Sequence, residues 1–350
     1  MQRPDSKTIS IEMPCDMHTH LREGELQNRI VPHFAWLDAV VAMLNYKDPL
    51  DLDQILTERA RIEELIHQAG GHAELLIAPL MNEGTSADDI DAFAANGIKI
   101  VKVMLKGVTT NSHLGVNRIR DMYPIFARME ELGMIASFHG ELPNVPHRWA
   151  EQAFLPTYEI LALKFPRLKI VAEHISTREG IELIKSLPEN VVATLTASHM
   201  MITGRQVFKS ESAEEVLFPN RFFRPVAKEH EDMIAIQQAA MSGNPKFIFG
   251  SDSAPHTPEK KQLPNPAAGA FFPPELAIPA IAEAFVNLNK LDRLDAFLSG
   301  NAQRFYGLTP SKRQLTLKYG EWTTPEYIEG IVPLLCVYPM YWRIDDNGTD

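Results

Sequence analysis

Two histidines one residue apart, His18 and His20, follow an apolar run near the start of the chain, in the stretch CDMHTHLR. Successive side chains of a β-strand point to opposite faces, so both imidazoles would project from the same face. Two imidazole nitrogens on one face can bind a divalent cation such as zinc. The pair alone is a weak signal, and its interpretation depends on whether other segments supply matching ligands.

Four further apolar runs end in ionisable side chains, namely Lys102, His139, His174 and Asp252. Five other histidines lie in expected helices or loops and are interpreted as surface or packing residues: His33, His67, His72, His147 and His230. The interpretation of His113 and His199 stays open, because both fall in loops expected beside the strand ends. The reactive residues that end the runs therefore form a distinct set.

This set could form a site for two cations. The histidines of the first run could bind one cation and His139 and His174 the other, with Asp252 as an anionic ligand. The run IKIVKVML has no Asp or Glu at its end and carries Lys102 instead. Burial beside cations lowers the pKa of a lysine, and the free amine can add carbon dioxide to give a carbamate able to bridge two metals. A lysine that merely extends from a strand end to water is the alternative, and the converging ligands favour the carbamate.

The reactive residues must be brought together by the elements that carry them. Eight short apolar runs alternate with longer amphipathic stretches, and most are apolar on both faces, as in parallel strands buried from both sides. The runs are IEMPCDMHTH, AVVAML, ELLIAPLM, IKIVKVML, MIASFHG, KIVAEH, VVATLT and KFIFGSD. Eight such units predict an α/β fold, the (β/α)8 TIM barrel, in which active sites form at the carboxyl ends of the strands.

The segments between the runs predict helices, loops and a single domain. Helices are expected over Asp51–Ala69 and Val116–Leu132, each followed by glycine. Segments 198–225 and 257–274 lack clean helix patterns and are expected to be loops on the catalytic face. We expect one catalytic barrel domain over residues 1–350, with its core at about 11–308 and a C-terminal appendage at about 309–350.

The composition argues against several classes of protein. The 350 residues carry a formal net charge of −11, whereas nucleic-acid-binding proteins usually present a basic face. No apolar run approaches the roughly 18–20 residues that span a bilayer, and the first residues lack the apolar core of a signal peptide. The two cysteines, Cys15 and Cys336, make no disulfide framework. A cytoplasmic protein without membrane or nucleic-acid partners is expected.

The motifs DMHTHLREGE, FHGE, AEHIST and GSDSAPH, together with the strand that carries Lys102, resemble the dihydroorotases of the short, type II kind in the amidohydrolase superfamily. The resemblance covers about residues 11–308. The short termini agree with it, since many other amidohydrolases carry an extra β-sandwich domain. The resemblance implies a barrel of the metal-dependent hydrolase type that reversibly cyclises N-carbamoyl-L-aspartate to L-dihydroorotate, a step of pyrimidine biosynthesis.

The resemblance also implies roles for individual residues. It implies two zinc ions per chain, bridged by Lys102 as N6-carboxylysine, with Asp252 as the base that takes a proton from the hydroxide and passes it to the leaving nitrogen. The metal ligands would be His18, His20, Lys102 and Asp252 for one ion, and His139, His174 and the same carbamate for the other. Arg22, Asn45, His256 and the backbone at Ala268 would bind the substrate, and Thr109-Thr110 would lie in a mobile loop that closes over it. The family is commonly homodimeric.

The chain departs from the family pattern at three places, which bear on the substrate. Met43-Leu44-Asn45 stands where the family often has Met-Pro-Asn, and residues 104–108 differ from the usual start of the mobile loop. Arg224 replaces a common leucine whose backbone touches substrate, and we expect this new cation near an anionic substrate to influence affinity. Two alternatives remain: a dihydropyrimidinase-like or hydantoinase-like hydrolase, which Arg22 disfavours because those rings often lack a carboxylate, and a non-catalytic binding protein of the same fold.

Overall fold

Eight parallel strands form a closed barrel in the computed structural model, which describes residues 7–210 and 214–345. Two hydrogen-bonded sheets, β2-β3-β4 and β5-β6-β7-β8-β9, are joined where the Met81 N–H donates to the Lys102 carbonyl (2.8 Å) and the Asp252 N–H donates to the His18 carbonyl (2.8 Å). The strands are β2 (Cys15–Thr19), β3 (Ala39–Leu44), β4 (Glu74–Pro79), β5 (Ile100–Met104), β6 (Ile135–His139), β7 (Lys169–Ala172), β8 (Val191–Leu195) and β9 (Phe247–Phe249). Each of the eight predicted runs contributes one of these strands, so the predicted fold class is confirmed.

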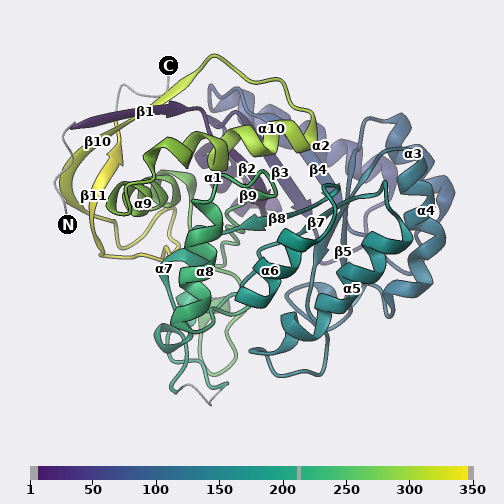
Figure 1. Ribbon diagram of the computed structural model, residues 1–350. Coiled ribbons are helices and arrows are strands. Elements are labelled where there is room, and N and C mark those ends of the chain that lie inside the picture. The colour runs from purple at the N-terminus through teal and green to yellow at the C-terminus, as the bar shows by residue number, and fades with distance from the viewer. Residues whose placement is uncertain (1–6, 211–213, 346–350) are drawn as a thin grey trace.

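Helices surround the barrel and bury the outer face of the strands, as Figure 1 shows. The helices are α1 (Gly24–Phe34), α2 (Leu52–Gln68), α3 (Ala87–Ala95), α4 (Tyr123–Glu131), α5 (Ala150–Lys164), α6 (Arg178–Ser186), α7 (Ala197–Met201), α8 (His230–Ala240), α9 (Pro274–Asn287) and α10 (Asn301–Tyr306). All six residues of β3 and all five of β5, β6 and β8 are buried. Strands covered on both faces explain why the runs read as continuously apolar.

The two predicted helices differ in how well their bounds match. The helix predicted over Asp51–Ala69 is α2, whose N-terminus is closed by a capping box between Asp51 and Gln54. The helix predicted from Val116 begins only at Tyr123, after a short 3-10 turn at Ile119–Met122. Pro124 lies in the first turn of α4, where its missing N–H costs no hydrogen bond.

The first apolar run is divided between two sheets. β1 (Thr8–Glu12) pairs antiparallel with β10 (Gln314–Thr323), which pairs in turn with β11 (Pro339–Ile344). Figure 1 shows this small sheet at one side of the barrel, beside α9. Met13 and Pro14 separate β1 from the barrel strand β2, and the proline cannot donate to a strand ladder. Residues 346–350 of the predicted appendage lie outside the described residues.

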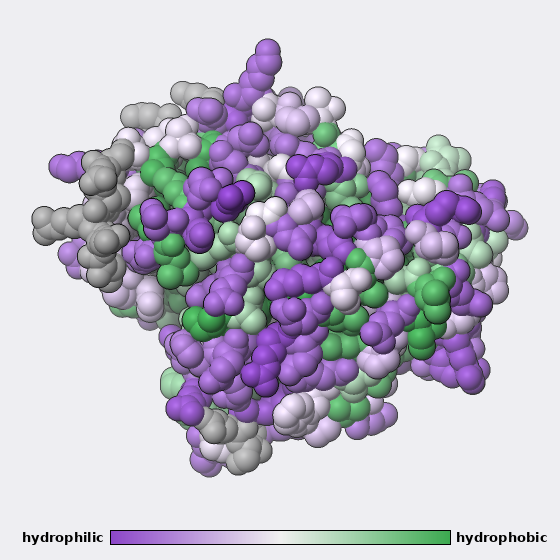
Figure 2. Space-filling model, in the orientation of Figure 1, coloured by the Kyte–Doolittle hydropathy of each residue, from purple (hydrophilic) through white to green (hydrophobic). Residues whose placement is uncertain are grey.

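The molecular surface in Figure 2 is mostly hydrophilic, with smaller hydrophobic areas between the polar ones. None of the helices in residues 7–210 and 214–345 is both long and apolar enough to cross a membrane.

Candidate metal centre

Two histidines and an aspartate meet at the carboxyl ends of β2 and β9. The Nε2 atoms of His18 and His20 lie 3.4 Å and 3.3 Å from Asp252 Oδ1. The hydrogen bond from the Asp252 N–H to the His18 carbonyl fixes the two strand ends against each other. The first pair of predicted ligands therefore lies together with the predicted carboxylate.

The second pair of histidines adjoins the first. His139 ends β6, His174 follows β7, and His139 Nδ1 lies 3.2 Å from His174 Nε2. The His174 ring is 5.0 Å from that of His18, measured between centroids. Burial lowers the pKa of all four imidazoles, most strongly for His20 and His174. Neutral rings expose lone pairs, which is the form that binds metal.

Lys102 lies on β5 and belongs to the same cluster. Its side chain is almost fully buried, and its Nζ atom has no hydrogen-bond partner among the described residues. Burial lowers the pKa of the amine, and this effect outweighs the opposing influence of Glu173 and Asp252. Burying an amine without a partner costs free energy, so we expect a further group to bind the Lys102 nitrogen.

The cluster has the properties of a cation site. The Nε2 atom of His18, like Lys102 Nζ, is buried without a partner in the described part of the chain. Arg22, His174 and Asp252 adopt left-handed backbone conformations, with φ of 67°, 43° and 48°. Such conformations are unfavourable for residues other than glycine, and they concentrate at functional sites. Nitrogen and carboxylate ligands of this kind suit zinc.

Two glutamates contact the histidines at the ring nitrogens that point away from the cluster. Both lie in the sequence motifs, but no role was predicted for them. Glu173 accepts from His18 Nδ1 (2.7 Å) and from the hydroxyls of Ser137 and Thr194. Glu141 contacts His139 Nε2 at 2.7 Å. Carboxylates that hold the remote nitrogen of a metal-binding histidine fix its orientation and tautomer. In the sequence, Glu173 directly precedes His174, and Glu141 follows His139 by two residues. This proximity to strand-end histidines could have indicated their role.

We expect Glu173→Gln to weaken zinc binding by about 10- to 100-fold, because an amide cannot accept from His18 and both hydroxyls as the carboxylate does. The measurement is a zinc dissociation constant from competition with a chelator. Glu151→Gln is the matched control, since Glu151 is equally buried but its partners are Ser176 and Thr177, away from the histidines. Equal zinc affinity in the Glu173 variant and wild type would contradict the assignment.

The predicted substrate residues lie beside the cluster. The guanidinium of Arg22 donates from Nε to the Pro255 carbonyl (2.7 Å), and its Nη2 lies 3.2 Å from His256 Nε2. His256 Nε2 also lies 3.0 Å from the Ala268 carbonyl. These three predicted contacts thus form one wall, built by the exit of β2 and by residues just before and within the predicted loop 257–274. Asn45 is buried on the adjacent strand end.

The loop that carries Thr109 and Thr110 is closed over the cluster. The Thr110 hydroxyl donates to the Ala268 carbonyl (3.0 Å), and the Asn111 amide donates to the Asn45 carbonyl (3.0 Å). The chamber above the cluster keeps only about 30 Å³ of free space. A wider space of about 420 Å³ adjoins it and shares four lining residues: His20, Arg22, Asn45 and Thr110. The closed loop therefore leaves little free space directly above the cluster.

Arg224 lines the chamber, but its guanidinium is directed to protein groups. Its Nε donates to Glu141 (3.0 Å), and its Nη1 lies 2.5 Å from His147 Nδ1. The charge of Arg224 helps hold the pKa of the Glu141 carboxyl at about 2, after the larger effect of the His139 hydrogen bond. Arg224 thus reaches the second histidine pair through Glu141.

The two histidines whose interpretation was open have structural contacts. His199 contacts Thr196 and the Pro225 carbonyl, and His113 contacts the Lys47 carbonyl.

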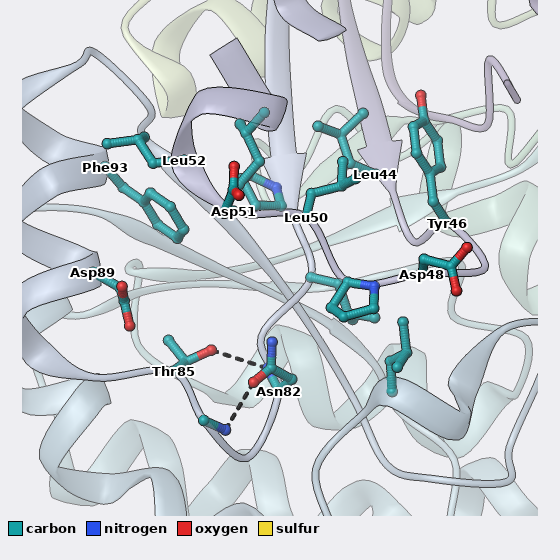
Figure 3. Close-up of a pocket in the computed structure, with 16 residues that line it drawn as sticks. Leu44, Tyr46, Asp48, Leu50, Asp51, Leu52, Asn82, Thr85, Asp89 and Phe93 are labelled. Carbon is teal, nitrogen blue, oxygen red and sulfur yellow. Dashed lines mark hydrogen bonds between the residues drawn. The ribbon is translucent and has the colours of Figure 1, made fainter. Parts of the chain in front are cut away.

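A separate cavity of about 210 Å³ lies beside the ends of β3 and β4, between α2 and α3 (Figure 3). Leu44, Leu52 and Phe93 give it an apolar wall. Two of its acidic residues are engaged in helix capping: Asp51 accepts from Gln54, and Asp89 accepts from Ser86. Its lining residues include no histidine and no lysine, in contrast to those of the chamber at the barrel end.

Known proteins resemble the chain over nearly its whole length. The sequence matches the amidohydrolase family over residues 15–308. A protein of Aromatoleum aromaticum named dihydroorotase is 36% identical over 349 residues, covering 97% of this chain and 99% of its own. A Schizosaccharomyces pombe protein named probable dihydroorotase is 37% identical over 330 residues, covering 91% and 94%. The crystal structure of Saccharomyces cerevisiae dihydroorotase in complex with 5-fluoroorotic acid superposes with a TM-score of 0.88 at 31% identity, covering 97% and 99%.

More distant enzymes share the barrel. Dihydropyrimidinase from Brevibacillus agri superposes with a TM-score of 0.78 at 14% identity, over 97% of this chain and 83% of its own. At this identity the likeness shows a common fold alone.

Proposed function

The chain belongs to the amidohydrolase family and is a dihydroorotase, and on this premise we propose how its residues carry out the reaction. The reaction is the reversible ring closure of N-carbamoyl-L-aspartate to L-dihydroorotate. Membership of the family implies a metal centre. We propose that this centre consists of two zinc ions and a carbamate on Lys102.

The observation that carries the proposal is the convergence of four neutral histidines, a carboxylate and a buried amine without a partner. His18, His20 and Asp252 would hold one zinc ion, and His139 and His174 the other. When bound, the zinc ions supply a polarised amide carbonyl and a water molecule of lowered pKa. Glu173 and Glu141 orient the imidazoles by holding their remote nitrogens.

Lys102 would supply the bridging anion. Its lowered pKa favours the free amine, whose nitrogen forms a bond to the carbon of carbon dioxide and releases one proton. The product is a carboxylate on a long stem, which is the anionic ligand that the end of β5 otherwise lacks. Glu173 and Asp252 are the other acids near Lys102, and Glu173 is already engaged by His18.

Asp252 would move the proton. Its Oδ1 lies within 3.4 Å of two imidazole nitrogens, and burial raises the pKa of its carboxyl. A base with a raised pKa can accept a proton from water and return it to a leaving nitrogen near neutral pH. Ring opening uses this transfer in one direction, and ring closure uses it in reverse.

The wall formed by Arg22, His256 and Ala268 would hold the ring carboxylate, and Asn45 would hold the ring beside it. Arg22 offers a planar guanidinium suited to a carboxylate. Thr109 and Thr110 would exclude water once the loop closes. Arg224 would act on affinity through Glu141 and its own charge at the edge of the chamber.

We also propose that residues 1–350 form a single catalytic domain and that the chain works as a homodimer in the cytoplasm. Support for the dimer comes from exposed apolar side chains on α5, where Ile160 and Leu163 are 52% and 86% exposed. Figure 2 shows hydrophobic areas among polar ones on the side where Figure 1 places α5. A monomer in sedimentation of the intact chain would contradict the dimer.

The test of the function compares two rings that differ in the carboxylate. We expect turnover of L-dihydroorotate, with kcat/KM at least about 100-fold above that of dihydrouracil, because Arg22 would have no partner on the ring without a carboxylate. Chelation should abolish the activity, and added zinc should restore it. Preference for dihydrouracil would favour the dihydropyrimidinase-like alternative, and zinc well below one ion per chain would favour a binding protein.

A further inference from the structure

A second buried lysine, Lys261, lies behind the wall that we propose for the substrate carboxylate. It ends the 3-10 turn Pro258–Lys261, and 7% of its surface is exposed. Its Nζ donates to three backbone carbonyls, those of Phe222 (3.0 Å), Ala267 (2.9 Å) and Gly269 (2.7 Å). No carboxylate pairs with Lys261 in the part of the chain that the structure describes. A buried cation without a counter-ion is costly, so its retention points to a role.

Two of the three carbonyls that Lys261 contacts belong to the neighbours of Ala268, one residue of the wall. Ala267 and Gly269 flank Ala268, and the Gly269 N–H donates to the same Phe222 carbonyl that Lys261 contacts. The ammonium thus fixes the Ala267–Ala268 and Gly269–Ala270 peptide units, and the Phe222 carbonyl holds the Ala268–Gly269 unit between them. The ammonium also connects them to the segment that leads to Arg224.

This arrangement sets the direction of the Ala268 N–H. The Ala267–Ala268 peptide is trans, and in a planar trans peptide the C=O and N–H bonds point to opposite sides. Because the Ala267 carbonyl is bound to Lys261, the Ala268 N–H must point away from the lysine. Among the described residues, this N–H has no acceptor, and Ala268 lines the chamber beside Arg22.

The packing allows few other arrangements of this loop. Gly269 has φ of 141°, and a Cβ atom there would lie 2.7 Å from the Ala254 carbonyl oxygen and 2.9 Å from His256 Nε2. The Ala268 carbonyl is itself bound by His256 and Thr110. The free N–H is thus held by contacts on both neighbouring peptide units.

We propose that Lys261 is a positioning residue, whose ammonium holds the backbone so that the Ala268 N–H donates to the substrate carboxylate. The inference rests on the proposed function and adds to it the residue that holds one of its contacts, the backbone at Ala268, in place. The positive charge of Lys261 also favours an anion on the far side of the wall.

The test is Lys261→Met, which keeps the length of the side chain and removes its three donated hydrogen bonds. We expect KM for dihydroorotate and the inhibition constant of 5-fluoroorotate to rise about tenfold or more, with kcat within about threefold and zinc content unchanged. Lys290→Met is the control, because it removes the same charge from an exposed lysine that lines neither the chamber nor the wider space beside it. Both constants should stay within about twofold of wild type in the control.

Unchanged constants in Lys261→Met, or a fall in kcat without a rise in KM, would overturn the inference. Failure of the wild type to turn over dihydroorotate would instead count against the proposed function, so the two failures are distinct.

A measurement on the wild type covers the case in which the variant does not fold. Burial, followed by the charge of Arg22, lowers the pKa of Lys261 to about 7. The ammonium is therefore present below this pH and lost above it. Of the other groups facing it, the pKa of Arg22 is about 10 and that of His256 about 2, so neither changes charge near neutrality. The inhibition constant of 5-fluoroorotate should rise severalfold from about pH 6 to about pH 8.5, and a constant value would overturn the inference.

Discussion

Replacing Asp252 by asparagine is expected to reduce turnover of dihydroorotate by roughly a thousandfold or more, because the amide can neither accept the proton nor serve as an anionic ligand. Asparagine keeps the size of the side chain and the backbone hydrogen bond to His18. The measurement is kcat, together with the zinc content of the purified variant. Retained zinc with lost turnover would assign the effect to proton transfer, and lost zinc would assign it to ligation.

Asp38→Asn provides the comparison for Asp252. Asp38 is also a buried aspartate, but it precedes β3 and pairs with Arg313 at the opposite end of the barrel. Residues at that end act on stability rather than on chemistry. We therefore expect a lower melting temperature with near-normal kcat. Near-normal turnover in the Asp252 variant would refute its role as the base.

Replacing Lys102 by alanine should remove both zinc and activity, because the bridging carbamate has no substitute at the end of β5. The substitution leaves a cavity the length of the lysine side chain beside the histidines, since Lys102 is almost fully buried. A short carboxylic acid such as propionate could occupy this space and supply the missing anion. Zinc content and turnover should then recover in part, and both should rise with the concentration of the acid.

Propylamine is the control for this rescue, because it fills a similar volume without a carboxylate. Rescue by the amine and not by the acid would show that Lys102 acts as an amine. Full zinc content in Lys102→Ala without any additive would refute the carbamate. Wild-type protein supplied with ¹³C-labelled bicarbonate should show one carbamate carbon.

Much of the barrel could be predicted from the sequence because its signals are local. Strands buried on both faces produce uninterrupted apolar runs, and all eight were recognised. Reactive residues such as His139 and Asp252 come directly at or after these runs, so the parallel arrangement of the strands alone brings them to one end. The α2 helix could be located from Asp51 and Asp53, expected in its first turn, and from the glycines past its end; the structure places Asp51 at the N-cap.

Other features depend on contacts between distant segments, which periodicity does not reveal. The division of the first run between two sheets depends on β10, about 300 residues later. The pairing of Arg224 with Glu141 and the closed position of Thr110 against Ala268 are long-range contacts between loops. Lys261 sits in a segment that reads as an irregular loop, and only its three carbonyl partners distinguish it from its exposed neighbour Lys260.

The small sheet has a consequence for the order of folding during synthesis. β1 is synthesised before the eight barrel strands, but its partner β10 is made only after all of them. Until then, Ile9 and Ile11, which are buried in the finished sheet, have no partner strand to cover them. The barrel strands can pair with sequence neighbours as they emerge, whereas β1 must wait for the last part of the chain. A strand that is synthesised before the barrel is thus among the last to reach its native position.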